Sequence, residues 1–139
     1  MRAVVDTNIL VSALFSRRGA ANRVLVAATD GLFTALASPP LFLEYEDVLK
    51  RSENRLRHGL TLDQVDALLR SLAALIEPVE VRFLWRPQLR DPDDEMVLEA
   101  AINGAADVVV TYNVADFGPA RRFGLRVAAP QEFLKDITR

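Results

Sequence analysis

The chain has 139 residues, 50% of them hydrophobic and 26% charged, which is the composition of one soluble globular domain. Its formal net charge of −2 argues against a protein that binds nucleic acid by bulk electrostatic attraction. The absence of cysteine excludes disulfides and thiolate metal sites, and no apolar stretch approaches the about 20 residues of a membrane helix.

The first half of the chain alternates short apolar runs with amphipathic segments. Ser38 precedes two prolines and predicts a helix start, and Thr61 predicts the cap of another helix. In chain order the pattern predicts a buried strand over 2–5, helices over 8–16 and 20–30, a strand over 32–37, a helix from 39 to about 50, a polar connection over 52–59 and a helix over 61–76.

The second half continues this alternation. The run over 107–111 is the clearest buried strand, because it has three consecutive valines without alternation. The other predicted elements are a strand over 77–83, a loop over 85–94, a helix over 95–105 closed by Gly104, a strand over 125–129 and a terminal helix from Pro130. We therefore expect an α/β sandwich around a mostly parallel sheet, formed by one domain over residues 1–139. No signal peptide follows Met1, so we expect a cytoplasmic protein.

Three polar residues follow the first strand: Asp6, Thr7 and Asn8. A helix cap needs one oxygen, which Thr7 or Asn8 could supply, so the carboxylate of Asp6 indicates a second role. Functional crevices of parallel sheets lie beyond the carboxyl ends of the strands. Asp6 would therefore share a rim with the residues that follow the valines of strand 107–111, if the two strands are neighbours. Those residues are Thr111, Asn113 and Asp116. Equally, Asp6 could cap a helix and Asp116 could simply turn a loop.

The helix from residue 39 supplies a third acid. Glu44 lies in one row with Leu41 and Val48, so it borders the buried face. Glu46 and Asp47 point further away and are typical of solvated charges. Glu44 is therefore the candidate of this helix, although it could merely flank the core.

A fourth acid comes from the segment DPDDEMVLEAA. Asp94 shares a face with Val97 and Leu98, which predicts that it points inward at the first turn. An acidic helix start is common by itself, because negative charge favours the helix dipole there. Three neighbours fit that role of cap or dipole partner: Asp91, Asp93 and Glu95. Asp91 is the reserve candidate for the acid that this segment contributes.

Together the four acids imply a cation, because carboxylates packed closely repel one another unless protons or cations relieve them. The chain has no cysteine, and we expect its single histidine, His58, to be a surface residue in a polar loop. An all-oxygen site suits Mg²⁺ or Mn²⁺ better than Zn²⁺. The acids are Asp6, Glu44, Asp94 and Asp116.

Three stretches of the chain form a specific combination: VVDTNILVSAL, SPPLFLEYEDVL and DPDDEMVLEAAINGAADVVVTYNVADF. In this combination the chain resembles a PIN domain, and more narrowly the bacterial PIN toxins of type II toxin–antitoxin pairs, of the VapC kind. The resemblance covers essentially the whole chain. It implies a compact three-layer α/β/α sandwich with a parallel sheet and a metal-dependent ribonuclease site.

Residue by residue, the resemblance places the catalytic, metal-binding acids of the family at Asp6, Glu44, Asp94 and Asp116. It also implies that polar side chains hold the acids in place. These belong to Asn8, Thr111 and Asn113, with Thr7 as a further contributor. Many relatives have Thr-Gly-Asp where this chain has Thr111, Tyr112 and Asn113. Asn113 can coordinate or hydrogen bond but carries no charge, so one acidic group of those relatives is missing here.

The implied reaction is the Mg²⁺-dependent or Mn²⁺-dependent hydrolysis of phosphodiester bonds in RNA, with single-stranded RNA as the substrate. Two arginine pairs are candidate guides for the strand: Arg17 with Arg18, and Arg121 with Arg122. Tyr112 and Trp85 are candidate stacking faces, whereas Phe117 is expected in the core. The resemblance also implies an antitoxin partner and a homodimer. Leucines of the middle helices could serve such a dimer or the core: Leu62, Leu69 and Leu72.

Other functions remain open at this point. A receiver domain has similar alternation, but it needs an acidic pair beside Asp6 and a lysine after the last strand, and neither is present. A dinucleotide-binding domain needs a glycine-rich turn after the first strand, which is also missing. A PIN-fold binding module without catalysis, an RNA-maturation enzyme and a structure-specific nuclease are the alternatives on the same fold.

Overall fold

The computed structural model describes residues 1–83 and 88–138. The elements, in chain order, are β1 (Arg2–Val5), α1 (Thr7–Phe15), α2 (Ala20–Thr29), β2 (Thr34–Ala37), α3 (Pro39–Lys50), α4 (Ser52–His58), α5 (Leu62–Leu75), β3 (Glu77–Pro78), α6 (Pro92–Asn103), β4 (Val108–Val110), the 3₁₀ helix η1 (Val114–Phe123), β5 (Arg126–Ala128) and α7 (Pro130–Ile137). Within the described ranges, no helix combines the length and the apolar character needed to cross a membrane.

The strands form one sheet in the order β3-β2-β1-β4-β5, and every neighbouring pair is parallel. The predicted α/β sandwich is therefore confirmed, and its sheet is parallel throughout the described strands. Val5 of β1 pairs with Val110 of β4. Because parallel strands end at the same rim, the residues that follow these two strands, Asp6 and Thr111, meet there.

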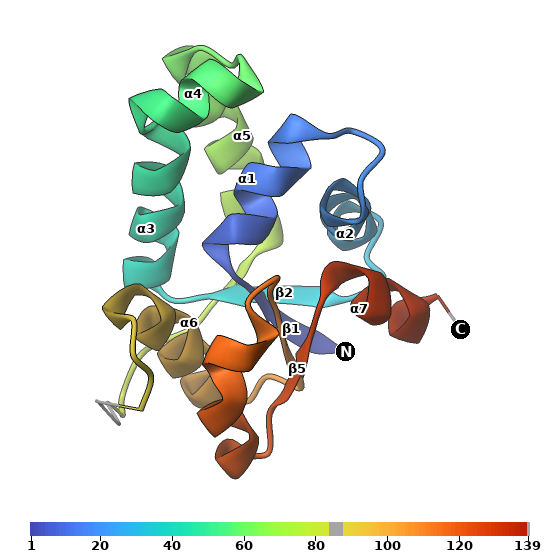
Figure 1. Cartoon of the computed structure of the whole chain (residues 1–139), viewed down its shortest axis with the longest axis vertical. Coiled ribbons are helices and arrows are strands. Elements are labelled where there is room, and N and C mark those ends of the chain that lie inside the picture. The colour runs from blue at the N-terminus through green and yellow to red at the C-terminus, as the bar shows by residue number, and fades with distance from the viewer. Residues whose placement is uncertain (84–87, 139) are drawn as a thin grey trace.

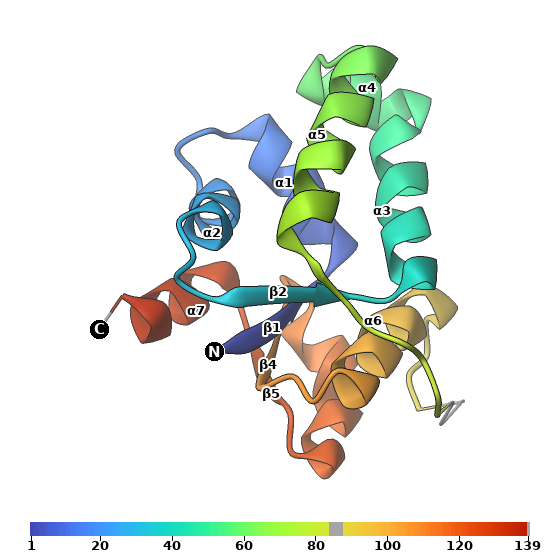
Figure 2. The same ribbon diagram turned by 180° about the vertical axis from the view of Figure 1, so that it is seen from behind.

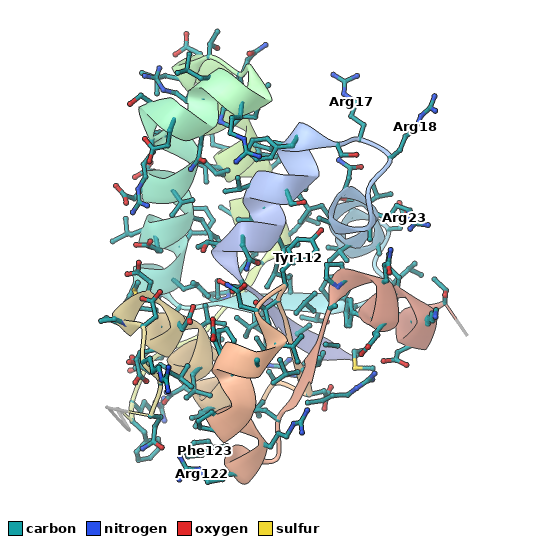
Figure 3. The ribbon with its side chains drawn as sticks, in the orientation of Figure 1. Arg17, Arg18, Arg23, Tyr112, Arg122 and Phe123 are labelled. Carbon is teal, nitrogen blue, oxygen red and sulfur yellow. The ribbon has the colours of Figure 1, made fainter. Side chains whose placement is uncertain are left out.

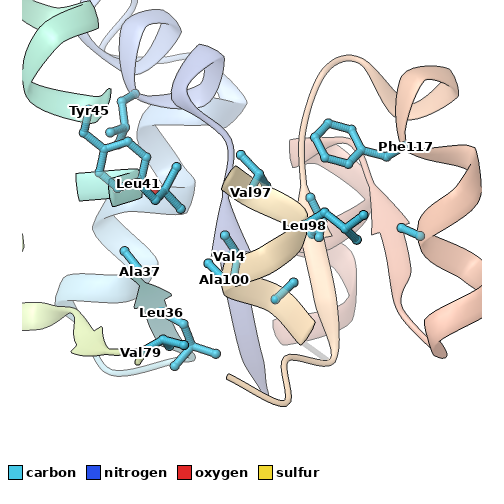
Figure 4. Packing of buried hydrophobic residues seen from close by; sticks show 14 of the residues in the cluster. Val4, Leu36, Ala37, Leu41, Tyr45, Val79, Val97, Leu98, Ala100 and Phe117 are labelled. Carbon is cyan, nitrogen blue, oxygen red and sulfur yellow. The ribbon is translucent and has the colours of Figure 1, made fainter. Parts of the chain in front are cut away.

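Helices cover both faces of the sheet, which gives three layers. On one face, side chains of α1, α2 and α7 pack on Ala3, Val5 and Val110. On the other face, α6 lies against β1, β2 and β4, and α3 and α5 extend the same core. Figure 4 shows Val4 of β1 between Leu41 of α3 and the apolar residues of α6.

α1 and α3 begin at the carboxyl ends of β1 and β2 and extend away from the sheet, together with α4 and α5 (Figure 1). α3 and α5 run side by side away from the sheet, and α4 joins them at their far ends (Figures 1 and 2). α1 begins directly after β1 and contacts both α3 and α4. α1 and α3 are therefore neighbours, and α4 lies at the far end of both helices.

Residues 52–59, predicted as a connection, instead contain α4. The helix has Glu53 in its first turn and basic residues in its last turn, which is the charge order that the helix dipole favours. Gly59 ends it in the left-handed region at φ 74°. His58 is not a free surface residue, since its Nε2 pairs with the Leu49 carbonyl and its Nδ1 accepts from the Leu60 amide.

The strand predicted over 77–83 pairs only at Glu77 and Pro78. The next residues leave the sheet, and the side chain of Asn103 on α6 satisfies their backbone. Asn103 Oδ1 accepts from the amides of Arg82 and Phe83, and its Nδ2 donates to the Phe83 carbonyl. A side-chain amide therefore takes the place of a neighbouring strand.

Several helix boundaries follow their caps. Ser38 accepts from the Leu41 amide, and Thr61 forms a reciprocal capping box with Gln64, as the sequence predicts. The helix predicted from residue 95 begins three residues earlier, at Pro92, because Asp91 accepts from the Asp93 amide and caps it. The strand predicted over 32–37 begins at Thr34.

Gly104→Ala is expected to lower the free energy of unfolding by about 1–3 kcal/mol. A Cβ at this position would lie 2.8 Å from Val79 Cγ2 and 2.9 Å from the Ala100 carbonyl oxygen, so the segment after β3 would have to move. Gly118→Ala is the control, because a Cβ there meets nothing within 4 Å. Urea unfolding of both variants measures the difference, and equal midpoints would contradict the close approach.

Candidate functional site

Three of the four predicted acids meet in one pocket. Asp6 follows β1, Glu44 comes from α3 and Asp94 from the first turn of α6, and all three line a cavity of about 470 Å³, here called the acidic pocket. Asp116 of η1 does not line it. It lines an adjoining cavity of about 810 Å³, which Asp91 and Asp94 also line. The fourth acid therefore lies beside the pocket that the other three share.

Asp6 occupies the N-cap position of α1, but its side chain makes no capping hydrogen bond. Instead Thr111 Oγ1 donates to its Oδ2 at 2.7 Å, and Thr7 Oγ1 donates to its Oδ1 at 3.3 Å. Asp6 is only 4% exposed. Burial raises the pKa of its carboxyl group, and the Thr111 hydrogen bond partly opposes that rise.

Thr111 links the ends of two neighbouring strands. It is fully buried, and besides donating to Asp6 it accepts from the Asn113 amide at 3.0 Å. One hydroxyl therefore orients the carboxylate after β1 and holds the loop after β4. Asn113 is exposed and lines the acidic pocket.

Tyr45 fixes the position of α3 relative to the sheet. Its hydroxyl donates to the carbonyl of Val5, the last residue of β1. Burial, and next the charge of Asp6, raise the pKa of the Tyr45 hydroxyl, so it remains a donor. This hydrogen bond holds the neighbouring residue, Glu44, close to the end of β1.

Asp94 carries the largest electrostatic strain of the pocket. Burial and, after it, the negative charges of four neighbouring aspartates together raise its pKa to about 7: Asp6, Asp91, Asp116 and Asp93. The pKa of Glu44 is also raised by burial and then by Asp93, while Arg51 lowers it. The acids of the pocket therefore repel one another, and either a proton or a cation stabilises them.

The donor atoms of the pocket fit a hard cation. Carboxylate oxygens are the ligands that Mg²⁺ and Mn²⁺ prefer. Asn8 lines the pocket, and its Oδ1 is buried without a hydrogen-bond partner in the described structure, which leaves an acceptor for a cation or water. Among residues 1–83 and 88–138, no three of the His, Cys, Asp and Glu side chains stand close enough to hold one ion as they lie. Coordination by three carboxylates therefore requires side-chain rotation.

Two further acids line the acidic pocket. Asp91, the reserve candidate, caps α6 and also lines both cavities. Asp93 was predicted only as a cap or dipole partner, yet it lines the pocket beside Glu44 and Asp94. The acidic start of α6 therefore stabilises the helix and adds negative charge to the site.

Glu95 is a buried residue whose role the sequence did not reveal. It is 3% exposed, and its Oε1 accepts from the amides of Gln88 and Leu89 at 2.6 and 2.8 Å. Gln88 and Leu89 line the adjoining cavity together with Asp91 and Asp94. Glu95 therefore anchors the segment that leads into the acidic start of α6.

Glu95→Ala is expected to lower the free energy of unfolding by about 2–4 kcal/mol, because two amides lose a charged acceptor. Glu95→Gln retains an oxygen at the same place and should cost only about 1 kcal/mol. Urea unfolding compares the two variants. If the Gln variant were as unstable as the Ala variant, the two hydrogen bonds from backbone amides would not be the source of the stability that Glu95 contributes.

Three polar residues at the α3–α4 corner complete the pocket, and no sequence pattern marked them as site residues: Arg51, Asn54 and Arg57. The arginines predicted as guides lie elsewhere. Arg17 and Arg18 project from the α1–α2 turn into solvent, and Arg122 lies at the opposite end of the molecule, where it donates to Gln88 Oε1 (Figure 3). None of these three lines the acidic pocket.

The three predicted aromatic residues differ in their surroundings. Phe117 is fully buried, as expected for the core. Tyr112 is 47% exposed and lines the acidic pocket, with its hydroxyl 3.1 Å from Ser12 Oγ (Figure 3). Trp85 lies outside the described residues. Of the candidate stacking faces, Tyr112 therefore stands at the pocket.

Comparison with known proteins agrees with this architecture. The PIN domain family matches residues 2–115. Among solved structures, VapBC2 from Rickettsia felis, bound to a DNA fragment from its promoter, superposes with a TM-score of 0.62 at 17% sequence identity, over 93% of this chain and 98% of that one. No curated protein matches the chain in sequence. The family match spans most of the chain, and the chain belongs to the PIN-domain family.

Proposed function

We propose that the chain is an endoribonuclease that depends on Mg²⁺ or Mn²⁺, cleaves single-stranded RNA and serves as the toxin of a toxin–antitoxin pair. The observation that supports this most is that Asp6, Glu44 and Asp94 line one pocket, with Asp116 beside it, in a chain of the PIN family. PIN domains are in general nucleases that use divalent metal, and carboxylates supply such a site.

The residues that would hold the cation are Asp6, Glu44, Asp94 and Asp116. When bound, the cation supplies Lewis acidity toward a phosphate oxygen and lowers the pKa of a water molecule. Thr111 and Thr7 hold the two oxygens of Asp6, so this carboxylate keeps one orientation. Glu44 would orient the attacking water, and Asn8 and Asn113 would add neutral oxygens to the site.

The toxin role further implies an antitoxin, a homodimer and action in the cytoplasm. The structural neighbour VapBC2 is a complex bound to promoter DNA, which supports a protein partner for this chain. An antitoxin could place an Arg or Lys among the acids. For the homodimer, Leu62 is 46% exposed on α5, whereas Leu69 and Leu72 are buried in the core and are not available to a partner.

The proposal is tested by incubating the chain with end-labelled single-stranded RNA in Mg²⁺ or Mn²⁺, and with EDTA as the metal-free arm. We expect RNA fragments with metal and intact RNA with EDTA. Single-stranded DNA of the same sequence is the substrate control. Intact RNA under every metal condition would contradict the proposal, and cleavage of DNA alone would favour a structure-specific DNA nuclease.

The toxin role has a separate test in growing bacteria. Expression of the wild type is expected to arrest growth, and Asp94→Asn is expected to abolish the arrest at equal protein level. Normal growth together with strong cleavage in vitro would instead favour a housekeeping RNA-processing enzyme.

A further inference from the structure

The acidic pocket continues as a groove between α1 and α3. One stripe of α1 lines it at Asn8, Ser12 and Phe15, and one stripe of α3 lines it at Glu44 and Arg51. These residues recur at helical spacing, so each stripe follows one face of its helix for about 10 Å. The groove therefore runs from the acids at the sheet rim toward the α3–α4 corner, between two helices that lie side by side in Figures 1 and 2.

The far end of the groove carries positive charge. Arg57 of α4 lines it, and its guanidinium carbon lies 4.0 Å from the centroid of the Phe15 ring. Stacking on an aromatic face restrains the guanidinium while leaving its N–H donors for another ligand. Within residues 1–83 and 88–138, Arg57 has no ion pair with an acidic side chain.

Arg51 differs from Arg57, although both line the groove. Arg51 Nη2 lies 2.8 Å from Asp47 Oδ2 and 3.8 Å from Glu44 Oε1, so its charge is largely matched within α3. Among the described residues that line the groove, Arg57 is therefore the arginine without an acidic partner. It is exposed, and it is separated from the acids by about two helical turns.

An aromatic face lies between the two ends. Tyr112 follows β4, lines the same cavity and contacts Ser12 of α1 through its hydroxyl. Its ring is about half exposed. A groove with acids at one end, a stacked arginine at the other and an exposed ring between them matches the chemistry of a single strand, whose phosphates and bases alternate.

We propose that the α1–α3 groove holds the RNA strand next to the cleaved bond, with Arg57 gripping a flanking phosphate and Tyr112 stacking on a base. This inference rests on the proposed nuclease function and assigns its substrate-holding residue. Arg57 acts on binding, since it stands at the opposite end of the groove from the acids. It compensates for their repulsion of the RNA backbone.

The test measures binding of a fluorescein-labelled single-stranded RNA to Arg57→Gln in the Asp94→Asn background, in Mg²⁺. We expect the Kd to rise about tenfold and the slope of log Kd against log salt to fall by about 0.7, the loss of one phosphate contact. Arg70→Gln is the matched control, because Arg70 is exposed on α5 and does not line the groove. Arg57→Lys should keep the salt slope and lose part of the affinity.

The outcomes separate this inference from the proposed function. In the otherwise unchanged protein, Arg57→Gln is expected to raise KM and leave kcat unaltered. RNA cleavage by the wild type together with equal binding by the Arg57 and Arg70 variants would overturn the groove assignment and leave the nuclease intact. Loss of affinity and slope in Arg57→Gln, with no cleavage by the wild type under any metal, would uphold the groove and overturn the nuclease.

Discussion

Asp6→Asn is expected to lower metal-dependent RNA cleavage at least about 1,000-fold and to leave the fold intact. The substitution removes a charge while keeping the shape of the side chain and an oxygen that accepts from Thr111. Since Asp6 makes no capping bond to α1, the helix start does not depend on that charge. Single-turnover cleavage in Mg²⁺, with circular dichroism of both proteins, measures the effect.

Thr111→Val is the companion variant, because it keeps the volume of a fully buried residue and removes only the hydroxyl. Asp6 then loses its closest donor and the Asn113 amide loses its acceptor. We expect cleavage to fall by about 10- to 100-fold, less than for Asp6→Asn. Undiminished cleavage by well-folded Asp6→Asn would contradict the proposed metal site.

The second large effect is expected in stability, through Asp94. Its pKa is raised to about 7 in the folded chain, whereas an aspartate of the unfolded chain titrates near about 3.9. Between these two values the folded chain binds the proton and the unfolded chain has released it, so rising pH favours unfolding. In metal-free buffer the contribution of Asp94 to stability is therefore full below about pH 4 and is lost as the pH rises through about 7.

Asp94→Asn should remove this pH dependence. We expect the difference in free energy of unfolding between wild type and variant to change by about 2–4 kcal/mol between pH 4 and pH 7.5, with the variant favoured at the higher pH. Urea titrations in EDTA at several pH values measure it. Asp30→Asn is the control, because Asp30 is exposed at the end of α2. The free energy of unfolding of this variant should change with pH in parallel with that of the wild type.

Divalent metal should restore the stability that the wild type loses at high pH. Binding to the folded chain at one hundred times the Kd adds about 2.7 kcal/mol of stability. Added Mg²⁺ at pH 8 is therefore expected to raise the Tm of the wild type and to raise that of Asp94→Asn much less. Equal shifts in the two proteins would place the bound cation away from Asp94.

The rim of the site could be predicted from the sequence because it depends on topology. The apolar strand before Asp6 and the valine run before Thr111 both predict buried parallel strands, and such strands end at the same edge of a sheet. Helical periodicity likewise predicted that Glu44 borders the buried face of α3. These inferences need only the direction of the strands and one helix face.

The other features of the site depend on tertiary contacts, which the periodicity of the sequence does not encode. α6 is buried on most of its circumference, so its pattern could not distinguish the anchor Glu95 from a solvated cap. α4 is polar except for Leu56, and its charge order rather than an apolar stripe indicates the helix. Because residues 52–59 were predicted as a connection, Arg57 could not be placed opposite Phe15. Asp116 lies in the first turn of a 3₁₀ helix that the sequence did not predict, and this helix places it at the adjoining cavity.

The hydroxyl of Tyr45 bears on how any pH profile of this protein is interpreted. It keeps its proton at every pH at which the carboxyl groups titrate, so its hold on the Val5 carbonyl does not change over that range. α3 is thus fastened to the sheet by a contact that is insensitive to acidity. The contact therefore adds no pH dependence of its own between pH 5 and 8, a range in which the Asp94 carboxyl group titrates.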